Sequence, residues 1–174
     1  MIVKYAKVRI VKSPQRAHPT DAGIDLFAPN FTQEYATDLK LKNIEMNKDT
    51  EINEFGEIIL LPGQSILIPS GLIFEIDYGC MALLLNKSGI AAKKHLLIGS
   101  QVIDTFYSGE VHIDLHNVGK EDVRISPCDK LVQMVIIPVL TPDPKEFDKQ
   151  EIYEHMIVDK VRGDGGFGST DKKK

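Results

Sequence analysis

Asp104 is the residue of this sequence that is best placed to do chemistry. It follows the β-branched pair Val102-Ile103 and precedes Tyr107 and the dipeptide Ser108-Gly109. Val and Ile favour strands whereas Ser and Gly favour turns, so residues 102–117 are expected to form a hairpin. A carboxylate at a strand-to-turn junction can accept a proton from a water molecule, or orient that water, from a rigid scaffold. The alternative is an Asp that only accepts hydrogen bonds from turn amides.

The segment 162–170 has a composition that suits phosphate. Four glycines occur within the six residues 163–168, preceded by Arg162 and followed by Ser169 and Thr170. Successive amides of such a segment can form an anion-binding nest, to which Arg162 would add bidentate contacts and Phe167 a stacking face. The alternative is a disordered tail, and disorder is compatible with a mobile lid that orders on a ligand.

A second anion site is suggested where a strand leads into a helix at residues 86–91. Free amides at a helix N-terminus bind anions, and here Ser88 would add a hydroxyl and Lys87 a charge. A Ser N-cap with a solvated Lys is the alternative. Further along the chain, Gln133 stands inside an apolar strand, so its amide needs a partner in the protein or in a ligand.

Length and composition indicate one globular domain. The 174 residues are 43% apolar and 26% charged, with a net charge of -4. Because no basic block precedes the terminal lysines 172–174, duplex nucleic acid is not an expected partner. Cys80 and Cys128 lack the spacing of a zinc site or a disulfide framework. With no signal-peptide core and no membrane-length apolar run, we expect a cytoplasmic protein.

Short strands separated by turns predict an all-β barrel or sandwich. One short helix is expected at 89–95, capped by Ser88, and residues 131–140 should form a central strand. The polar residues 30–57 are expected to leave the core as a long loop or small hairpin. The other predicted strands are 2–11, 58–61, 65–68, 72–76, 80–85, 96–98, 110–117 and 122–125.

Together these pieces resemble the five motifs of the trimeric dUTPase family, the dUTP nucleotidohydrolases. Five segments look like these motifs and occur in the family's order, namely 22–28 (AGIDLFA), 87–91 (KSGIA), 102–110 (VIDTFYSGE), 129–133 (DKLVQ) and 162–170 (RGDGGFGST). The resemblance covers most of the chain outside 30–57. It implies one dUTPase-like domain over 1–174, with a jelly-roll-like β fold, a polar insertion at 30–57 and a flexible C-terminal arm from residue 159.

The resemblance also implies an activity, the hydrolysis of dUTP to dUMP and pyrophosphate. Asp104 would orient the water that attacks the α-phosphorus, and Tyr107 would pack under the deoxyribose and exclude a 2′-hydroxyl. Mg²⁺ would be held mainly by the triphosphate, with Asp25 acting on it through water. The enzyme would be a homotrimer with shared active sites.

The remaining substrate contacts follow from the same resemblance. Backbone groups between about Ile98 and Asp104, including those of Gln101, Val102 and Ile103, would read the uracil edge. The phosphates would meet Lys87, Ser88, Gly89, Gln133 and Arg162, while Phe167, Gly168, Ser169 and Thr170 would close over the nucleotide.

The sequence departs from the family pattern at three places. Lys87 replaces the usual Arg, so a point charge replaces a bidentate fork. Phe106 replaces a small or acidic residue before the tyrosine. The segment between His95 and Asp104 is short and resembles that of some phage-encoded relatives. If this protein is phage-encoded, it would act in the cytoplasm of the host.

Two alternative functions remain open. His112, Asp114 and His116 alternate on one strand face, where a solvated or interface-facing row is expected rather than a metal site. Asp114 stands about where the related dCTP deaminases carry a catalytic glutamate, so a dCTP deaminase or a bifunctional deaminase and dUTPase is the second hypothesis. A regulatory, protein-binding role of residues 30–57 is the third, against a harmless surface insertion.

Overall fold

The computed structural model describes residues 2–155, with side chains as far as residue 152. The chain divides into two compact units, Met1–Leu140 and Thr141–Lys174, of which the second contains helix α3 (Lys149–His155). No helix within residues 2–155 is long and apolar enough to cross a membrane.

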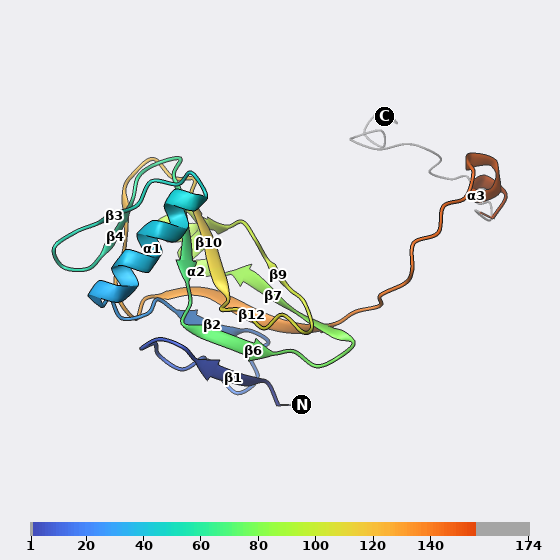
Figure 1. The fold of residues 1–174 in the computed structure, drawn as a ribbon, viewed down its shortest axis with the longest axis horizontal. Helices are drawn as coiled ribbons and strands as arrows, with labels where there is room; N and C mark the ends of the chain where they lie inside the picture. The colour runs from blue at the N-terminus through green and yellow to red at the C-terminus, as the bar shows by residue number, and fades with distance from the viewer. Residues whose placement is uncertain (1, 156–174) are drawn as a thin grey trace, which may run out of the picture. The chain divides into compact units, whose positions relative to one another are not determined.

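The first unit is built from twelve short strands in four antiparallel sheets (Figure 1). The sheet orders are β1-β6, β5-β10-β8, β11-β4-β3 and β2-β12-β7-β9. This is the predicted jelly-roll-like β class. The strands are β1 (Lys4–Lys7), β2 (Ile24–Phe27), β3 (Glu51–Ile52), β4 (Ile58–Leu60), β5 (Ser65–Pro69), β6 (Leu72–Glu75), β7 (Cys80–Asn86), β8 (Leu96–Ile98), β9 (Val102–Ile103), β10 (His112–Asn117), β11 (Val123–Ile125) and β12 (Lys130–Pro138).

Strand β12 is central, as its long apolar run predicts. It pairs with β2 on one side and with β7 on the other. Its residues Val132 and Met134 are fully buried. The alternate residues Gln133, Val135 and Ile137 are partly buried. Because neither face is fully exposed, the strand lacks the polar alternation of a half-exposed one.

The predicted short helix is present as α2 (Ser88–Lys94). The predicted cap is wrong, because Lys87 is the N-cap residue and no side chain bonds the first turn. Ser88 is instead the first helical residue. The helix ends at His95, whose φ of 52° is left-handed.

The prediction of a loop or small hairpin at 30–57 is only partly correct, because β3 pairs with β4 in a short hairpin but a helix precedes it. The largest element of this segment is helix α1 (Gln33–Glu45), which is capped by Thr32, whose hydroxyl accepts a hydrogen bond from the Tyr35 amide at 3.1 Å. Tyr35, Leu39 and Asn43 recur every four residues and are buried, so one face of α1 belongs to the core. The helix lies over the layer that contains β10 (Figure 1).

Two strand predictions also need correction. Strands β9 and β10 do not form a hairpin, because β9 pairs with β7 and β10 pairs with β5 and β8. The N-terminal strand β1 covers four residues only, and all four are exposed rather than half-buried. Two exposed residues beyond it, Val8 and Ile10, explain the misleading alternation, since they point apolar side chains outward.

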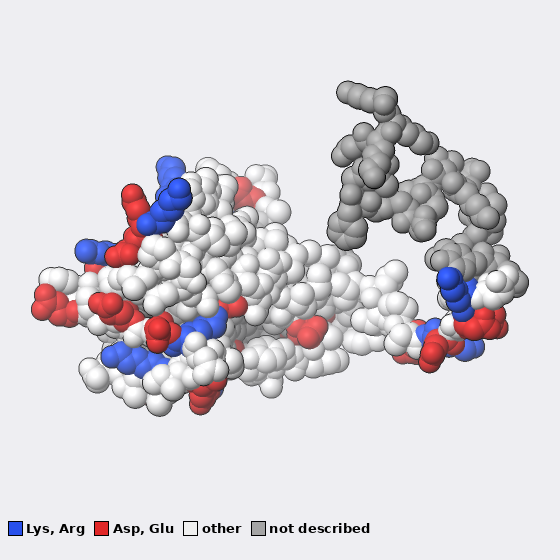
Figure 2. Space-filling view, turned by 90° about the horizontal axis from the view of Figure 1, so that it is seen from above, with Lys and Arg blue, Asp and Glu red and all other residues white. Residues whose placement is uncertain are grey.

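Charged side chains on one face of the molecule are interspersed. In Figure 2 the basic and acidic residues of the described part lie next to one another, without a large area of one sign. Ion pairs between exposed side chains include Lys42 with Glu45 and Lys4 with Glu75.

Candidate active site

Asp104 lies directly after β9, on an exposed loop. Its carboxylate accepts no hydrogen bond from residues 2–155, so it can hold a water molecule. Around it the loop is fixed, since Thr105 donates its hydroxyl to the Ile76 carbonyl at 3.0 Å and the Tyr107 amide donates to the Asp104 carbonyl at 3.3 Å. The carboxylate of Asp104 is therefore free of hydrogen bonds to the described residues, while the backbone of its loop is held in place by hydrogen bonds.

Tyr107 and Glu110 hold the other half of this loop. The Tyr107 hydroxyl donates to the Glu110 carbonyl at 3.1 Å, and a Cβ at Gly109 would lie 2.6 Å from that hydroxyl oxygen. The Glu110 carboxylate accepts two hydrogen bonds from Arg9, at 2.8 and 2.9 Å, and one from the Gly71 amide at 2.6 Å. A bidentate Arg contact of this kind restricts geometry as well as adding energy.

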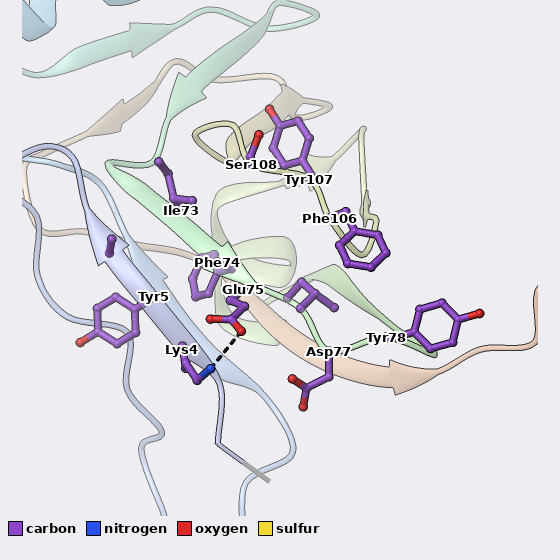
Figure 3. A pocket seen from close by; sticks show the side chains of 12 residues that line it. Lys4, Tyr5, Ile73, Phe74, Glu75, Asp77, Tyr78, Phe106, Tyr107 and Ser108 are labelled. Atoms are coloured by element: carbon purple, nitrogen blue, oxygen red, sulfur yellow. Dashed lines mark hydrogen bonds and ion pairs between the residues drawn. The ribbon is translucent and has the colours of Figure 1, made fainter.

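Phe106 adopts an unusual conformation between these two residues. Its φ of 64° is left-handed, which costs a residue with a Cβ about 1 to 2 kcal/mol. The turn sends Phe106 and Tyr107 in different directions (Figure 3). Phe106 meets Tyr78 with ring centroids 6.4 Å apart, in a pocket that also contains the Lys4–Glu75 ion pair.

A cavity of about 410 Å³ lies on the Tyr107 side of the loop. It brings together five of the predicted site residues, namely Gln101, Val102, Ile103, Asp104 and Tyr107. Its volume falls within the range of small-molecule sites. Ser100, from the segment predicted to read the base, also lines it, and the lining residues that sequence reasoning did not predict are Lys42, Met46, Leu67, Leu84, Val111 and His112.

The loop 99–101 forms one wall of this cavity and is partly engaged. The Gly99 amide donates to the Asp114 carbonyl at 2.9 Å, and the Gln101 carbonyl accepts from the Leu84 amide at 2.8 Å. The backbone of Ser100 and the amide of Gln101 make no hydrogen bond to the described residues. These groups are available to a ligand in the cavity.

A second cluster contains Asp25, Lys87 and Gln133, which the sequence places far apart. Asp25 and Gln133 are cross-strand partners in β2 and β12. The Asp25 carboxylate lies 2.5 Å from Lys87 Nζ and 2.9 Å from Lys130 Nζ. Gln133 donates to the Asn86 carbonyl at 3.0 Å, and a Cβ at Gly23 would collide with its side-chain oxygen. Lys130 was not among the predicted site residues.

The charge of Asp25 is stabilised by this cluster. Burial alone would raise the pKa of its carboxyl, but hydrogen bonds and charges from Lys130 and Lys87 outweigh burial and hold the pKa below its ordinary value. Oδ1 accepts a hydrogen bond from Lys87, whereas the buried Oδ2 is ion-paired with Lys130 but accepts no hydrogen bond of good geometry from the described residues. Ser88 and Gly89 are exposed beside the cluster, at the start of α2.

The two clusters lie toward opposite ends of β7. Ala82 is the cross-strand partner of Ile103, next to Asp104, and Lys87 lies five residues further on. A strand rises by about 3.3 Å per residue, which puts the level of Ile103, next to Asp104, about 17 Å from that of Lys87 along β7. Within one chain, therefore, the predicted residues form two half-sites.

Asp104, Tyr107, Lys87 and Gln133 lie within a match to a known protein family. Residues 52–171 match the dUTPase family model. The deoxyuridine 5'-triphosphate nucleotidohydrolase of Laribacter hongkongensis is 32% identical over 165 residues, which cover 93% of this chain and 90% of that protein. The chain belongs to the dUTPase family. It is, by that membership, a hydrolase of nucleotide metabolism.

Solved dUTPase structures share the fold. The dUTPase of Staphylococcus bacteriophage 80alpha, solved with dUPNHPP, has a TM-score of 0.72 and 22% identity, with 97% of each chain covered. A variant of the dUTPase from phage phi11 of S. aureus has a TM-score of 0.66 and 22% identity over 86% of this chain and 98% of its own. At this identity the likeness concerns the fold of the dUTPase chain.

The fifth dUTPase motif lies outside the described residues. This applies to Arg162, Phe167, Gly168, Ser169 and Thr170, and to the predicted mobility of the arm from residue 159. Their roles stay predictions.

The side chains of His112, Asp114 and His116, which alternate on one strand, do not share the same partners. His112 Nδ1 lies 2.8 Å from the Glu110 carbonyl, whereas Asp114 pairs with Lys48 at 2.5 Å and with His116 at 3.3 Å. Burial opposes the charge of Asp114, but Lys48 and His116 outweigh burial and lower its pKa. Sequence reasoning missed Lys48, which follows α1.

Proposed function

We propose that this chain hydrolyses dUTP to dUMP and pyrophosphate, with Asp104 orienting the attacking water. The observation that carries the proposal is the free carboxylate of Asp104 beside Tyr107, on a held loop in a cavity of about 410 Å³. A rigid, unengaged carboxylate can align a water with the α-phosphorus without reorganisation during the reaction. Tyr107 packs under the deoxyribose in this arrangement.

Uracil is read by the backbone of the loop that follows β8. The unengaged groups of Ser100 and the Gln101 amide support this assignment, since they face no competing partner among the described residues. Val102 and Ile103 complete the edge that excludes a 5-methyl group. Base selection through backbone groups is compatible with a loop that differs in sequence from the family pattern.

The triphosphate binds at the second half-site and at the C-terminal arm. Ser88 and Gly89 offer amides and a hydroxyl at the start of α2, Lys87 a positive charge, and Gln133 an amide. Arg162 and the residues 167–170 close over the nucleotide. The separation of the half-sites along β7 supports a homotrimer in which one copy supplies Asp104 and another supplies Ser88.

Mg²⁺ is proposed to enter with the triphosphate and to neutralise phosphate charge. Within the described residues no group of three acidic, His or Cys side chains offers a metal site. Asp25, which faces two lysines, would act on the ion through water. The phi11 dUTPase variant was solved with a structural Mg(II) ion.

The test is pyrophosphate release from dUTP, dCTP, dTTP and UTP with Mg²⁺, for the native chain and Asp104→Asn. We expect release from dUTP alone, reduced at least about 10²-fold by the substitution because water orientation is lost. Asp77→Asn, an exposed Asp at another turn, is the matched control and should keep full activity. Undiminished release by Asp104→Asn would contradict the mechanism.

Ammonia release from dCTP is measured alongside. A general base works best with a pKa near the operating pH, and the pKa of Asp114 is lowered by Lys48 and His116. We therefore favour hydrolysis over deamination. Ammonia from dCTP would reverse that order.

A further inference from the structure

The last turn of α1 contributes to the cavity that contains Asp104. Lys42 and Met46, the C-cap residue that follows α1, both line this cavity, although they come from the segment 30–57. The two residues are four positions apart, which puts them within about 40° of each other around the helix axis. The family match begins at residue 52, so these residues lie outside it.

Asn43 fixes this turn against the sheet. Its side-chain amide donates to the Leu67 carbonyl at 2.9 Å, and its side-chain oxygen accepts from the Leu67 amide at 2.8 Å. Asn43 thus pairs with strand β5 as a neighbouring strand would, and satisfies backbone groups at its open edge. Leu67 itself lines the cavity, so the contact sets the position of Lys42 and Met46 relative to the pocket wall.

The residues after α1 also support the loop 99–101, which forms a wall of the cavity. Lys48 lies 2.5 Å from Asp114, and Asp114 lies 3.3 Å from His116. A Cβ at Gly99 would collide with the Asp114 carboxylate and would lie 2.5 Å from His116 Nε2. This cluster therefore packs directly beneath the loop 99–101.

We propose that α1 is part of the nucleotide site, in which Met46 packs against the bound nucleoside and Lys42 places a positive charge beside it. This inference rests on the proposed function of the same cavity. Met46 is 54% exposed in the free protein, and its flexible thioether can adapt to a base or sugar. The Lys42 ammonium is held only loosely, 3.4 Å from Glu45, and can turn to an anionic ligand.

Direct contact is tested by NMR of the full chain carrying ¹³C-methyl methionine. The five methionines give few signals, and Met46→Leu assigns the one of interest. On addition of dUPNHPP, the imido analogue of dUTP, we expect the Met46 methyl signal to shift. The methyl of Met134, which is fully buried in β12, is the internal reference and should stay in place.

Kinetics with matched variants test the energetic contribution. Met46→Ala should raise KM for dUTP roughly tenfold with little change in kcat, because apolar contact with the nucleoside is lost in ground and transition states alike. Leu41→Ala is the control, since Leu41 is 55% exposed on the same helix but does not line the cavity. Lys42→Gln should raise KM at low salt, and this increase should become smaller as the salt concentration rises, because salt screens the charge of Lys42. Lys40→Gln, on the far side of the helix, is the control and should leave KM unchanged at every salt concentration.

The outcomes separate this inference from the proposed function. If the native chain hydrolyses dUTP but the Met46 methyl is silent and both variants match their controls, α1 is only a structural helix. If the native chain neither binds the analogue nor hydrolyses dUTP, both proposals fall. Thermal unfolding of each variant shows whether a change in KM reflects lost contact or lost structure.

Discussion

Asp25 links the stability of the protein to pH through a buried ion cluster. It is 3% exposed and lies between Lys87 and Lys130. Its folded-state pKa lies below the ordinary value of 3.8, so its contribution is fully present above that value. The contribution is lost as the pH falls through the folded pKa.

Asp25→Asn should therefore destabilise the protein near neutral pH and do so less in acid. Removing one partner of a buried pair leaves uncompensated charge, which here costs roughly 2 kcal/mol because both lysines retain some contact with water. Urea unfolding of both chains at pH 7 and pH 3 gives the difference in free energy. Since Asp114 titrates with the same sign, only the difference between the chains reports on Asp25. A difference that does not shrink in acid would show that the charge of Asp25 is not what stabilises the cluster.

The left-handed backbone conformation of Phe106 is expected to lower the stability of the protein. Asn tolerates left-handed φ better than Phe, so Phe106→Asn should raise the free energy of unfolding by about 1 kcal/mol. The ring is 80% exposed, so little burial is lost. Phe106→Ala is the control in chemical denaturation, because it removes the contact with Tyr78 but lacks the polar side chain that makes this φ tolerable for Asn. Equal stability of the two variants would assign the effect to the ring.

At the scale of elements, the packing of α1 against β5 depends on the side-chain amide of Asn43. Asn43→Ala removes two hydrogen bonds to Leu67 and one to Leu39, and leaves the Leu67 backbone groups without partners. Buried unsatisfied groups cost about 1 to 3 kcal/mol, so we expect a loss of about 2 to 3 kcal/mol. Amide hydrogen exchange should accelerate at Leu67. Lys40→Ala, on the exposed side of α1, should change neither quantity.

The same helix shows what the sequence could not predict. Strand β12 was predictable because a long apolar run with no fully exposed face indicates a central strand whatever its partners are. The inward face of α1 reads Tyr35, Leu39, Asn43, and its third member is polar because it bonds a strand edge. The expected hairpin failed for a related reason. Ser108-Gly109 marks a local turn, but the pairing of β9 with β7 is decided by residues some twenty positions away.

The folded α1 also changes the hypothesis of a separate surface insertion. Tyr35 and Leu39 are core residues, and Asp38 contacts Arg9, which in turn holds Glu110 in the active-site loop. A deletion of 30–57 would open the core and loosen that loop, so it cannot separate regulation from activity. Exposed single substitutions such as Leu41→Ala and Lys40→Gln are the means to test for a protein partner.

At the scale of the whole molecule, the five motifs identified the family while their positions in space required the structure. Asp104 and Tyr107 line one cavity, and Asp25, Lys87 and Gln133 meet elsewhere, about 17 Å away along β7. Motif order along a chain carries no information about which copy of the chain completes which site. That information depends on an interface between copies.

Mixing two inactive variants tests whether sites are shared between copies. Asp104→Asn removes water orientation, and Ser88→Asp puts a negative charge where phosphate is proposed to bind, in a first helical turn that tolerates acidic residues. After unfolding and refolding together in equal amounts, roughly a quarter of shared sites would combine a native Asp104 with a native Ser88. We therefore expect about a quarter of native activity from the mixture and almost none from either variant alone. If each site lay within one chain, no site in the mixture would be intact, and activity would stay at the level of the separate variants.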